Sequence, residues 1–178
     1  MWNIQDVKNI IVEVNKEHGY TLDLPIKQNN RLEKVVAYCN IEYNRATGEI
    51  YPTRLEFGRD ILNVDDYDTL KQIVLHEYAH AIATDKYHSD CGHDDRFVNI
   101  CKQIGCYETK THVSTKTQRE LAKAKAKTSK YTIVCEHCGA ETHANRKTEL
   151  LKRLEKYPNH FRCNACGELG ALTLRQNR

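Results

Sequence analysis

Residues 76–80 constrain this chain more than any other stretch, because they read H-E-x-x-H and lie in a run that should be helical. The run, residues 67–84, contains no Gly or Pro. On a helix, residues i and i+4 share a face, so His76 and His80 can present two imidazole nitrogens to one zinc ion. Glu77 would then lie beside the ion as a general base without being a ligand. This combination is typical of metal-assisted hydrolysis.

The residues around the motif predict a buried helix. Asp65 and Asp66 can cap its start and suit the positive end of its dipole. Apolar side chains then recur at helical spacing: Leu70, Ile73, Val74, Tyr78, Ala81 and Ile82. The alternative is a core helix with two hydrogen-bonded histidines and a surface glutamate. Burying three such groups within five residues is costly unless they have partners, which favours the metal site.

A catalytic zinc takes three protein ligands and keeps one open position. One known pattern, with Gly and His at the third and sixth positions after the motif, is excluded because Ala83 and Lys86 stand there. We predict His93 as the third ligand. His88 is interpreted as a loop histidine near the cleft, and Cys91 is the alternative ligand.

The position of His93 favours it over the alternatives. It follows Gly92, which can turn the chain sharply. It also precedes a second amphipathic segment that ends near Gly105, with one apolar stripe formed by Phe97, Ile100, Cys101 and Ile104. A ligand at the start of a helix packed against the motif helix would be held rigidly.

Four cysteines near the C-terminus predict a second, structural zinc site. They form two C-x-x-C pairs separated by 24 residues, each followed by a glycine that can make a tight turn: Cys135, Cys138, Cys163 and Cys166. Four thiolates close a tetrahedral site. His137 and His143 are competing ligands, but four thiolates are the simpler choice. The 48 residues from 131 to 178 hold few large apolar side chains, so we expect them to need metal in order to fold.

These motifs resemble the SprT/Spartan metalloprotease family. Its members carry H-E-x-x-H and then a histidine within H-G-x-x-F or H-G-x-x-W. Here His93 follows His80 after twelve residues and is itself followed by Phe97, although Asp94 replaces the usual glycine. The similarity runs from about residue 35 onward. It includes the turn at 44–49, the Leu-Glu-Phe that follows at 55–57, the Thr-His pair at 111–112 and the zinc ribbon.

The resemblance implies a fold and an activity. The fold would be α+β, a zincin-like domain followed by a four-cysteine zinc ribbon. The activity would be that of a zinc metalloendopeptidase, with one catalytic and one structural zinc, acting on proteins bound or crosslinked to DNA. Tyr87, His88, Arg96 and His112 are candidates to assist Glu77, and the sequence does not choose among them.

Charge divides the chain into three parts. Residues 1–108 hold 18 acidic and 12 basic side chains. Residues 109–130 hold one acidic and seven basic side chains, and residues 131–178 hold five acidic and eight basic side chains. We therefore predict a catalytic domain over 1–108, a basic linker or helix over 109–130 and a ribbon over 131–178. Cations of the last two parts can neutralise phosphates, so candidate DNA contacts are Lys116, Arg119, Lys123, Lys125, Lys127, Lys130, Arg146 and Lys147.

Aromatic side chains in the ribbon extend this interpretation. Tyr157 and Phe161 lie near basic residues, a combination that suits single-stranded bases. The alternative for residues 109–130 is a solvated linker that does not bind nucleic acid. Two other functions stay open: a nucleic-acid-binding zinc protein whose zincin site is vestigial or regulatory, and a peptidase with a dedicated protein target and no DNA role.

Cysteine usage and the N-terminus indicate the compartment. The polar, acidic N-terminus does not resemble a secretory signal, and no run approaches the roughly 20 apolar residues that span a membrane. We therefore expect a cytoplasmic or nucleoid-associated protein that is not secreted and does not bind a membrane. Outside the ribbon, we expect four reduced thiols, two of them in the core: Cys39, Cys91, Cys101 and Cys106.

The remaining pattern predicts a few further elements. Apolar residues from Ile4 to Val14 indicate a first helix that ends near Gly19. Residues 35–43 and 49–57 read as two strands joined by a turn, and Pro52 predicts an edge or a bulge in the second. An edge strand near the cleft could align a substrate backbone by strand addition. Residues 148–157 can form a short helix between the two cysteine pairs.

Overall fold

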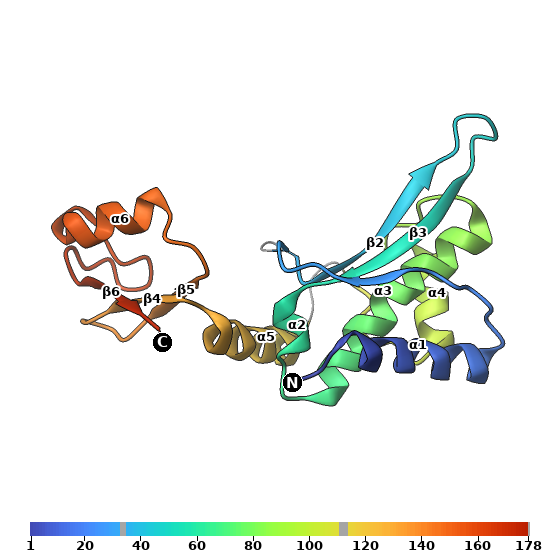
Figure 1. Ribbon diagram of the computed structural model, residues 1–178, viewed down its shortest axis with the longest axis horizontal. Coiled ribbons are helices and arrows are strands. Elements are labelled where there is room, and N and C mark those ends of the chain that lie inside the picture. Colours follow the sequence, from blue (N-terminus) through green and yellow to red (C-terminus); the bar gives the residue numbers. More distant parts are fainter. Residues whose placement is uncertain (33–34, 111–113, 178) are drawn as a thin grey trace. The chain divides into compact units, whose positions relative to one another are not determined.

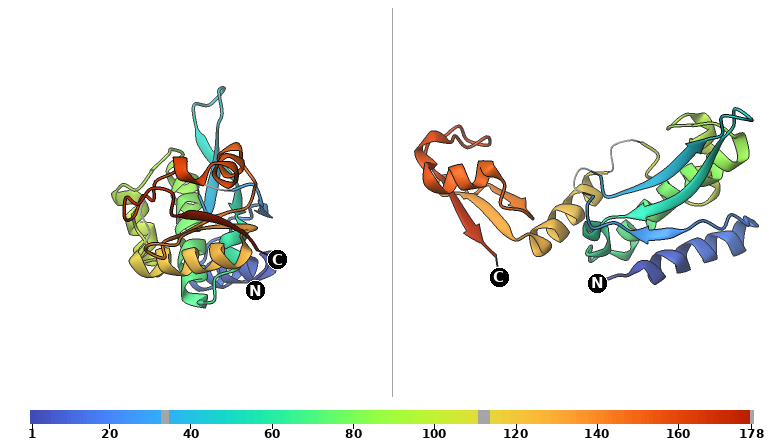
Figure 2. Two further views of the ribbon diagram at one scale, coloured as in Figure 1. Left: turned by 90° about the vertical axis from the view of Figure 1, so that its left-hand side faces the viewer. Right: turned by 45° about the horizontal axis from the view of Figure 1, so that its top comes forward.

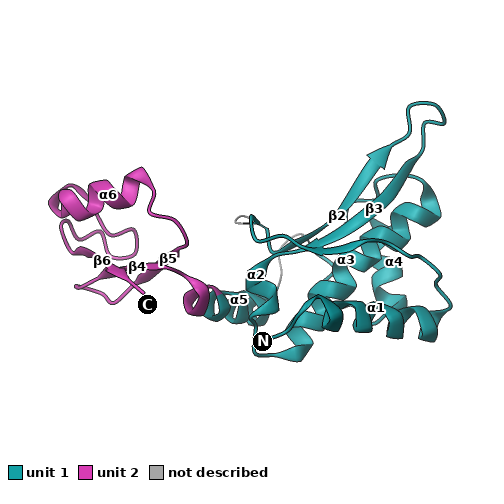
Figure 3. Ribbon diagram, viewed as in Figure 1, with its two compact units in different colours: residues 1–124 teal, residues 125–178 magenta. Residues whose placement is uncertain are grey.

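The computed structural model describes residues 1–32, 35–110 and 114–177 (Figure 1). These residues form two compact units, Met1–Ala124 and Lys125–Arg178 (Figure 3). The boundary between the units falls inside helix α5 (Thr115–Thr128). It therefore lies within the segment that we predicted as a basic linker or helix, and the first ten residues of α5 belong to unit 1.

Unit 1 combines helices with one three-stranded sheet, so the α+β class predicted for a zincin-like domain is confirmed. The sheet order is β1-β3-β2, with β1 parallel to β3 and β2 antiparallel to it. Helix α3 packs against β2 and β3, and α1 packs against α3 (Figure 2). The elements that precede α5 are α1 (Ile4–His18), β1 (Ile26–Gln28), β2 (Ala37–Tyr43), β3 (Ile50–Phe57), α2 (Arg59–Leu62), α3 (Tyr67–Tyr87) and α4 (Asp95–Gln103).

The strand that contains Pro52 is the central strand of this sheet, so of the two predicted settings for this proline only the bulge applies. Strand β1 pairs only with residues 55–57 of β3 and does not reach Pro52. On the other side, Pro52 pairs with Ile41, directly after the register shift between Asn40 and Ile41. A proline removes one ladder donor, which an irregular pairing tolerates. The edge strand on this side of the sheet is β2.

Helix α3 begins and ends where the local chemistry requires. The Asp66 carboxylate accepts hydrogen bonds from the backbone and the hydroxyl group of Thr69, which satisfies one free amide of the first turn. At the other end His88 adopts a left-handed conformation, with φ of 51°. Between these ends the helix is buried almost all round, as the apolar run before the motif predicts. The predicted first helix also forms, as α1 with Gly19 as its C-cap.

A buried carboxylate joins the strands of the sheet. Glu56 accepts hydrogen bonds from Arg54 Nε at 2.6 Å and from Asn29 Nδ2 at 2.6 Å, and Asn40 Nδ2 lies 3.4 Å away. The bond from Arg54, with help from Asn29 and Tyr38, lowers the pKa of Glu56 to about 2, although desolvation opposes this shift. The ionised carboxylate therefore stabilises the fold.

We expect Glu56→Gln to destabilise unit 1 by about 1.5–3 kcal/mol at neutral pH, the range for hydrogen bonds to a charged group. A group with a depressed pKa stabilises the fold above its unfolded-state pKa, and that contribution is lost as the pH falls through the folded-state value. The difference between variant and wild type should therefore shrink between about pH 4.5 and about pH 2. Denaturant unfolding followed by the fluorescence of Trp2, the only tryptophan, measures it.

The matched control for this prediction is Glu49→Gln, which removes an exposed carboxylate at the end of the same hairpin. Its unfolding free energy should stay within about 0.5 kcal/mol of wild type, as is usual for surface substitutions. Acid also protonates other groups in every variant, so the comparison uses differences between proteins at each pH. A Glu56→Gln deficit that persisted at pH 2 would contradict the assignment.

Unit 2 contains a second small sheet and little apolar core. Its strands are ordered β5-β4-β6 and are all antiparallel. Among the apolar residues that are not cysteines, only Val134, Leu151 and Leu154 are fully buried in the described part of this unit. The predicted short helix is present as α6. Beyond α5, the elements are β4 (Tyr131–Cys135), β5 (Glu141–Ala144), α6 (Glu149–Lys156), the 3-10 turn η1 (Pro158–His160) and β6 (Leu172–Gln176).

Two further expectations concern membranes and thiols. Each helix within residues 1–32, 35–110 and 114–177 is too short or too polar to cross a bilayer. All eight cysteines are free. Three of the four outside the ribbon are buried, one more than expected, and Cys39 is half-buried.

Candidate active site

Three histidines converge at the middle of α3. The Nε2 atom of His76 lies 3.3 Å from that of His80 and 3.2 Å from that of His93. Two nitrogens bound tetrahedrally to one zinc, each at about 2.0–2.1 Å, lie roughly 3.3–3.4 Å apart. The three side chains therefore fit the ligand shell of a zinc ion. Their role as ligands stays a prediction.

The structure also indicates why His93, and not its neighbours, joins this group. Gly92, with φ of 49°, turns the chain immediately before His93. Asp94 then caps α4 by accepting hydrogen bonds from the amides of Arg96 and Phe97. The aspartate that replaces the glycine of the SprT-like motif thus fits the local helix start. The Cys91 thiol instead faces the carbonyl of Ala83, 3.8 Å away.

A buried aromatic ring supports all three imidazoles. The Phe97 ring stacks on His80 with centroids 4.2 Å apart, and its centroid lies 5.1 Å from that of His76 and 4.9 Å from that of His93. Phe97 is fully buried in the core. Packing of this kind limits rotation of the imidazole rings and keeps their nitrogens facing one another.

A backbone carbonyl orients the first histidine. The Nδ1 atom of His76 lies 2.5 Å from the carbonyl oxygen of Glu108. Because a carbonyl can only accept, His76 must donate through Nδ1, and its Nε2 lone pair is left for a metal. The sequence did not indicate this contact, since any residue type offers a backbone carbonyl.

Glu77 lies next to the histidines and is almost fully buried, at 9% exposure. Desolvation raises the pKa of its carboxyl group to about 7, although the neighbouring His76 and the backbone N–H of Cys39 favour the ionised form. A cation held by the histidines would favour the ionised carboxylate further. A buried carboxylate with a raised pKa suits a group that accepts and returns a proton.

The histidines and Glu77 face a cleft of about 610 Å³. Strand β2 forms one wall, from Ala37 to Ile41, and α3 lines the cleft at Ile73 and Thr84. Helix α5 adds Gln118 and Leu121. An edge strand therefore borders the cleft, as the strand-addition hypothesis requires.

The residues that were candidates to assist Glu77 do not gather in this cleft. Tyr87, His88 and Arg96 are absent from its described lining. The Arg96 guanidinium instead hydrogen-bonds Asp94 and Ser89. The fourth candidate, His112, and the Thr-His pair to which it belongs, lie outside the described residues.

The four ribbon cysteines form a second cluster. The Sγ atoms of Cys135 and Cys166 are 3.8 Å apart, and so are those of Cys138 and Cys163. Two thiolates bound to a tetrahedral zinc at about 2.3 Å lie roughly 3.8 Å apart, so this cluster also fits a zinc ion. The competing ligand His143 hydrogen-bonds Thr132 instead. The two glycines that follow the cysteine pairs have positive φ, as predicted: Gly139 and Gly167.

The candidate DNA contacts are exposed, but several carry an acidic partner. Lys116 lies 2.9 Å from Asp66 and 3.0 Å from Asp68, Lys123 lies 2.6 Å from Glu120, and Lys147 lies 2.6 Å from Glu155. A charge count made segment by segment therefore misses the acidic partners of these cations. The remaining candidates, Arg119, Lys125, Lys127, Lys130 and Arg146, are exposed along α5 and in unit 2.

A comparison with protein-family models agrees with the motif analysis. The model of the SprT-like family matches residues 7–118, more than half of the chain. Among curated proteins, none matches the sequence. Two similar solved structures are metallopeptidase zymogens, jannalysin of Methanocaldococcus jannaschii and abylysin of Pyrococcus abyssi. They are 16% and 15% identical, each match covers 68% of this chain and 94% or 90% of the other, and both TM-scores are 0.37.

Proposed function

The chain belongs to the SprT-like family, and on this premise we propose that it is a zinc-dependent metalloendopeptidase. One observation carries the proposal: three histidine nitrogens meet at metal-ligand spacing, beside a buried carboxylate, at a cleft bordered by an edge strand. His76, His80 and His93 are the proposed ligands of the catalytic zinc. The four ribbon cysteines are the proposed ligands of a structural zinc.

Glu77 is the proposed general base. It accepts a proton from the water that attacks the scissile carbonyl and returns that proton to the leaving amine nitrogen. The chemistry that zinc supplies when bound is Lewis-acid chemistry, which lowers the pKa of a water and stabilises negative charge on a substrate oxygen. The carbonyl of Glu108 holds His76 in the tautomer that leaves Nε2 free. Phe97 keeps the three rings in place.

Strand β2 is the proposed binding edge for the substrate backbone. It lies at the edge of the sheet, and its residues 37–39 and 41 line the cleft next to Glu77. An extended peptide can add to such an edge through main-chain hydrogen bonds, which are independent of its sequence. This binding mode suits a protease that acts on unfolded or extended segments of many proteins.

Removal of metal should test the activity directly. An unfolded protein such as casein should be cleaved by the zinc-loaded chain, cleavage should stop after chelation, and added zinc should restore it. Elemental analysis should find about two zinc ions per chain, one for each ligand cluster. No cleavage by a protein that carries both ions would refute the proposed activity and would favour a zinc-containing binding protein.

The proposed substrates are proteins bound or crosslinked to DNA, and the basic residues of α5 and unit 2 would hold the DNA. Residues 109–178 carry a net charge of +9, whereas residues 1–108 carry −6. Tyr157 stacks on His160 with centroids 5.6 Å apart, and Lys156 lies over the Tyr157 ring. Such aromatic and cationic groups suit single-stranded DNA as well as the phosphate backbone.

The DNA proposal predicts a charge-dependent loss of affinity. Replacing Lys125, Lys127 and Lys130 together by alanine should reduce the log–log salt slope of DNA affinity by roughly two to three, about 0.7–0.9 per lost phosphate contact. Affinity should fall alike for all DNA sequences, because phosphate contacts carry no base information. A salt titration of fluorescently labelled DNA measures both quantities.

The matched control removes the same charge from unit 1, where Lys8, Lys16 and Lys27 are exposed. Its salt slope should stay close to wild type. Equal reductions of DNA affinity and salt slope in the two triple variants would mean that DNA binding depends only on net charge. That result would contradict the assigned contacts. Proteolysis without any DNA affinity would instead support a peptidase with a dedicated protein target.

A further inference from the structure

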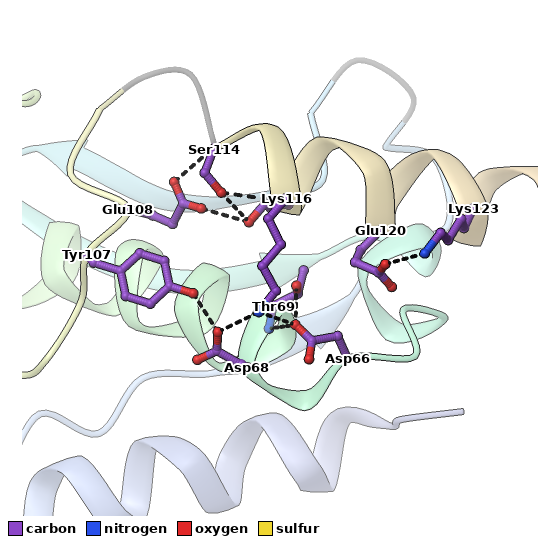
Figure 4. Close-up of polar contacts among 10 residues, drawn as sticks. Asp66, Asp68, Thr69, Tyr107, Glu108, Ser114, Lys116, Glu120 and Lys123 are labelled. Carbon is purple, nitrogen blue, oxygen red and sulfur yellow. Dashed lines mark hydrogen bonds and ion pairs between the residues drawn. The ribbon is translucent and has the colours of Figure 1, made fainter.

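Glu108 is buried at 4% exposure, although it carries a carboxylate and lies in an irregular segment. Its backbone carbonyl binds His76, and its side chain binds the start of α5. The Ser114 amide donates to the carboxylate at 2.9 Å, and the Thr117 hydroxyl donates to its other oxygen at 2.7 Å. Figure 4 shows the Glu108 side chain directed at Ser114. One residue thus connects the histidine cluster to the first turn of α5.

The segment before Glu108 is held from the other side by α3. Gln72, one helical turn before His76, donates to the carbonyl of Gly105 at 3.1 Å and accepts from the amide of Tyr107 at 2.8 Å. The Tyr107 hydroxyl in turn donates to Asp68 at 2.6 Å. The backbone that carries the Glu108 carbonyl is therefore fixed between α3 and α5.

The same helix forms part of the cleft. Thr117 and Ala124 are buried within unit 1, and Gln118 and Leu121 line the cleft beside the histidines. On its outer side, Lys116 binds Asp66 and Asp68 at the start of α3 (Figure 4). The first half of α5 is therefore packed as part of the catalytic unit rather than free as a linker.

We propose that Glu108 is a positioning residue for the histidine cluster: α5 anchors its carboxylate, and this anchor fixes the carbonyl that holds His76. The proposal rests on the proposed metal site, but not on proteolysis itself. Loss of the anchor lets the carbonyl move, so His76 loses its fixed tautomer and orientation. Partners of this kind typically contribute 10–100-fold to metal affinity or activity.

The test uses the full chain and weakens the contacts that anchor the Glu108 carboxylate. Thr117→Val keeps the shape of the side chain but removes its hydroxyl, and Glu108→Gln removes the charge. Each should weaken zinc binding at the histidine site about tenfold, the lower end of the second-shell range, because the carbonyl itself remains. Thr117→Ser, which keeps the hydroxyl, should recover most of the affinity. Competition with a chromophoric chelator measures these affinities.

Two measurements separate positioning from a general loss of structure. Cobalt substitution reports the histidine site by its visible absorption, which lacks the sulfur charge-transfer band of the thiolate site. The control Thr128→Val makes the same substitution at the far end of α5, away from Glu108, and should leave affinity and spectrum unchanged. If Glu108→Gln fails to fold, the nearly isosteric Thr117→Val decides the question.

The outcomes distinguish this proposal from the proposed function. Wild-type affinity and an unaltered cobalt spectrum in Thr117→Val would overturn the positioning role. An equal loss of zinc affinity in Thr128→Val would overturn the positioning role as well. The change in affinity would then come from α5 as a whole and not from the contact with Glu108. Weakened metal binding in Thr117→Val would support it even if the wild-type protein cleaved no peptide, in which case only the proposed activity would fail.

Discussion

Glu77→Gln is expected to lower kcat by roughly 10²–10⁴-fold, the usual contribution of a general base, while the histidine site keeps its zinc. Glutamine has nearly the same size as glutamate, and its carbonyl oxygen can still accept the Cys39 N–H. It cannot accept a proton from water. Steady-state cleavage of an unfolded protein and elemental analysis of the same sample measure the two effects.

The comparison variant for Glu77→Gln is Asp90→Asn. Asp90 also lines the cleft near the histidines, but its side chain is exposed, and one of its carboxylate oxygens accepts the Gly92 amide. Asp90→Asn should lose far less activity than Glu77→Gln, because the exposed carboxylate of Asp90 is solvated and is not the proposed base. The part of the acidic limb of the pH–rate profile that reports protonation of a carboxylate base should be lost only in Glu77→Gln. Comparable losses in the two variants would indicate that cleft charge, rather than a specific base, supports the reaction.

The parts of this structure that the sequence predicted are those in which residue type and spacing carry the signal. Histidines four residues apart need a helix to share a face, and α3 supplies it. Gly92 marks the turn before His93, and a cysteine spacing with two following glycines marks the ribbon. At each of these positions, either the chemistry of the side chain or the φ angle of the backbone restricts which residue type is possible. The sequence alone therefore predicts the structure at these positions.

The parts that escaped prediction depend on backbone atoms or on contacts between distant segments. The carbonyl of Glu108 reaches His76 across 32 residues, and any residue could supply it. Strand β1 has only three residues, too few for an alternating pattern. Lys116 forms ion pairs with Asp66 and Asp68, which lie about fifty residues away in sequence. A charge count made segment by segment therefore treats the lysine and the two aspartates as unpaired. Amphipathic spacing along residues 115–124 could have revealed that one face of α5 packs on unit 1.

Cys135→Ser is expected to abolish one zinc site and to unfold unit 2 while unit 1 stays folded. Apparent binding free energies of structural zinc are about 10–16 kcal/mol at neutral pH, and binding is coupled to folding. Unit 2 buries few apolar side chains besides its cysteines, so little besides a metal can hold its two C-x-x-C segments together. Zinc content should fall from about two ions to one. Amide NMR dispersion should collapse for residues 131–176 and persist for residues 4–104.

Two features of the chain make this experiment decisive. Trp2 is the only tryptophan and lies in unit 1, where its indole N–H donates to the Val64 carbonyl at 2.9 Å, so its fluorescence reports unit 1 alone. The matched control is Cys91→Ser, which changes a buried thiol outside the ribbon and also removes the alternative third ligand. Cys91→Ser should retain both zinc ions. An empty histidine site or altered Trp2 emission in Cys135→Ser would show that the two units depend on each other, and a metal-free but folded unit 2 would show that its apolar core suffices.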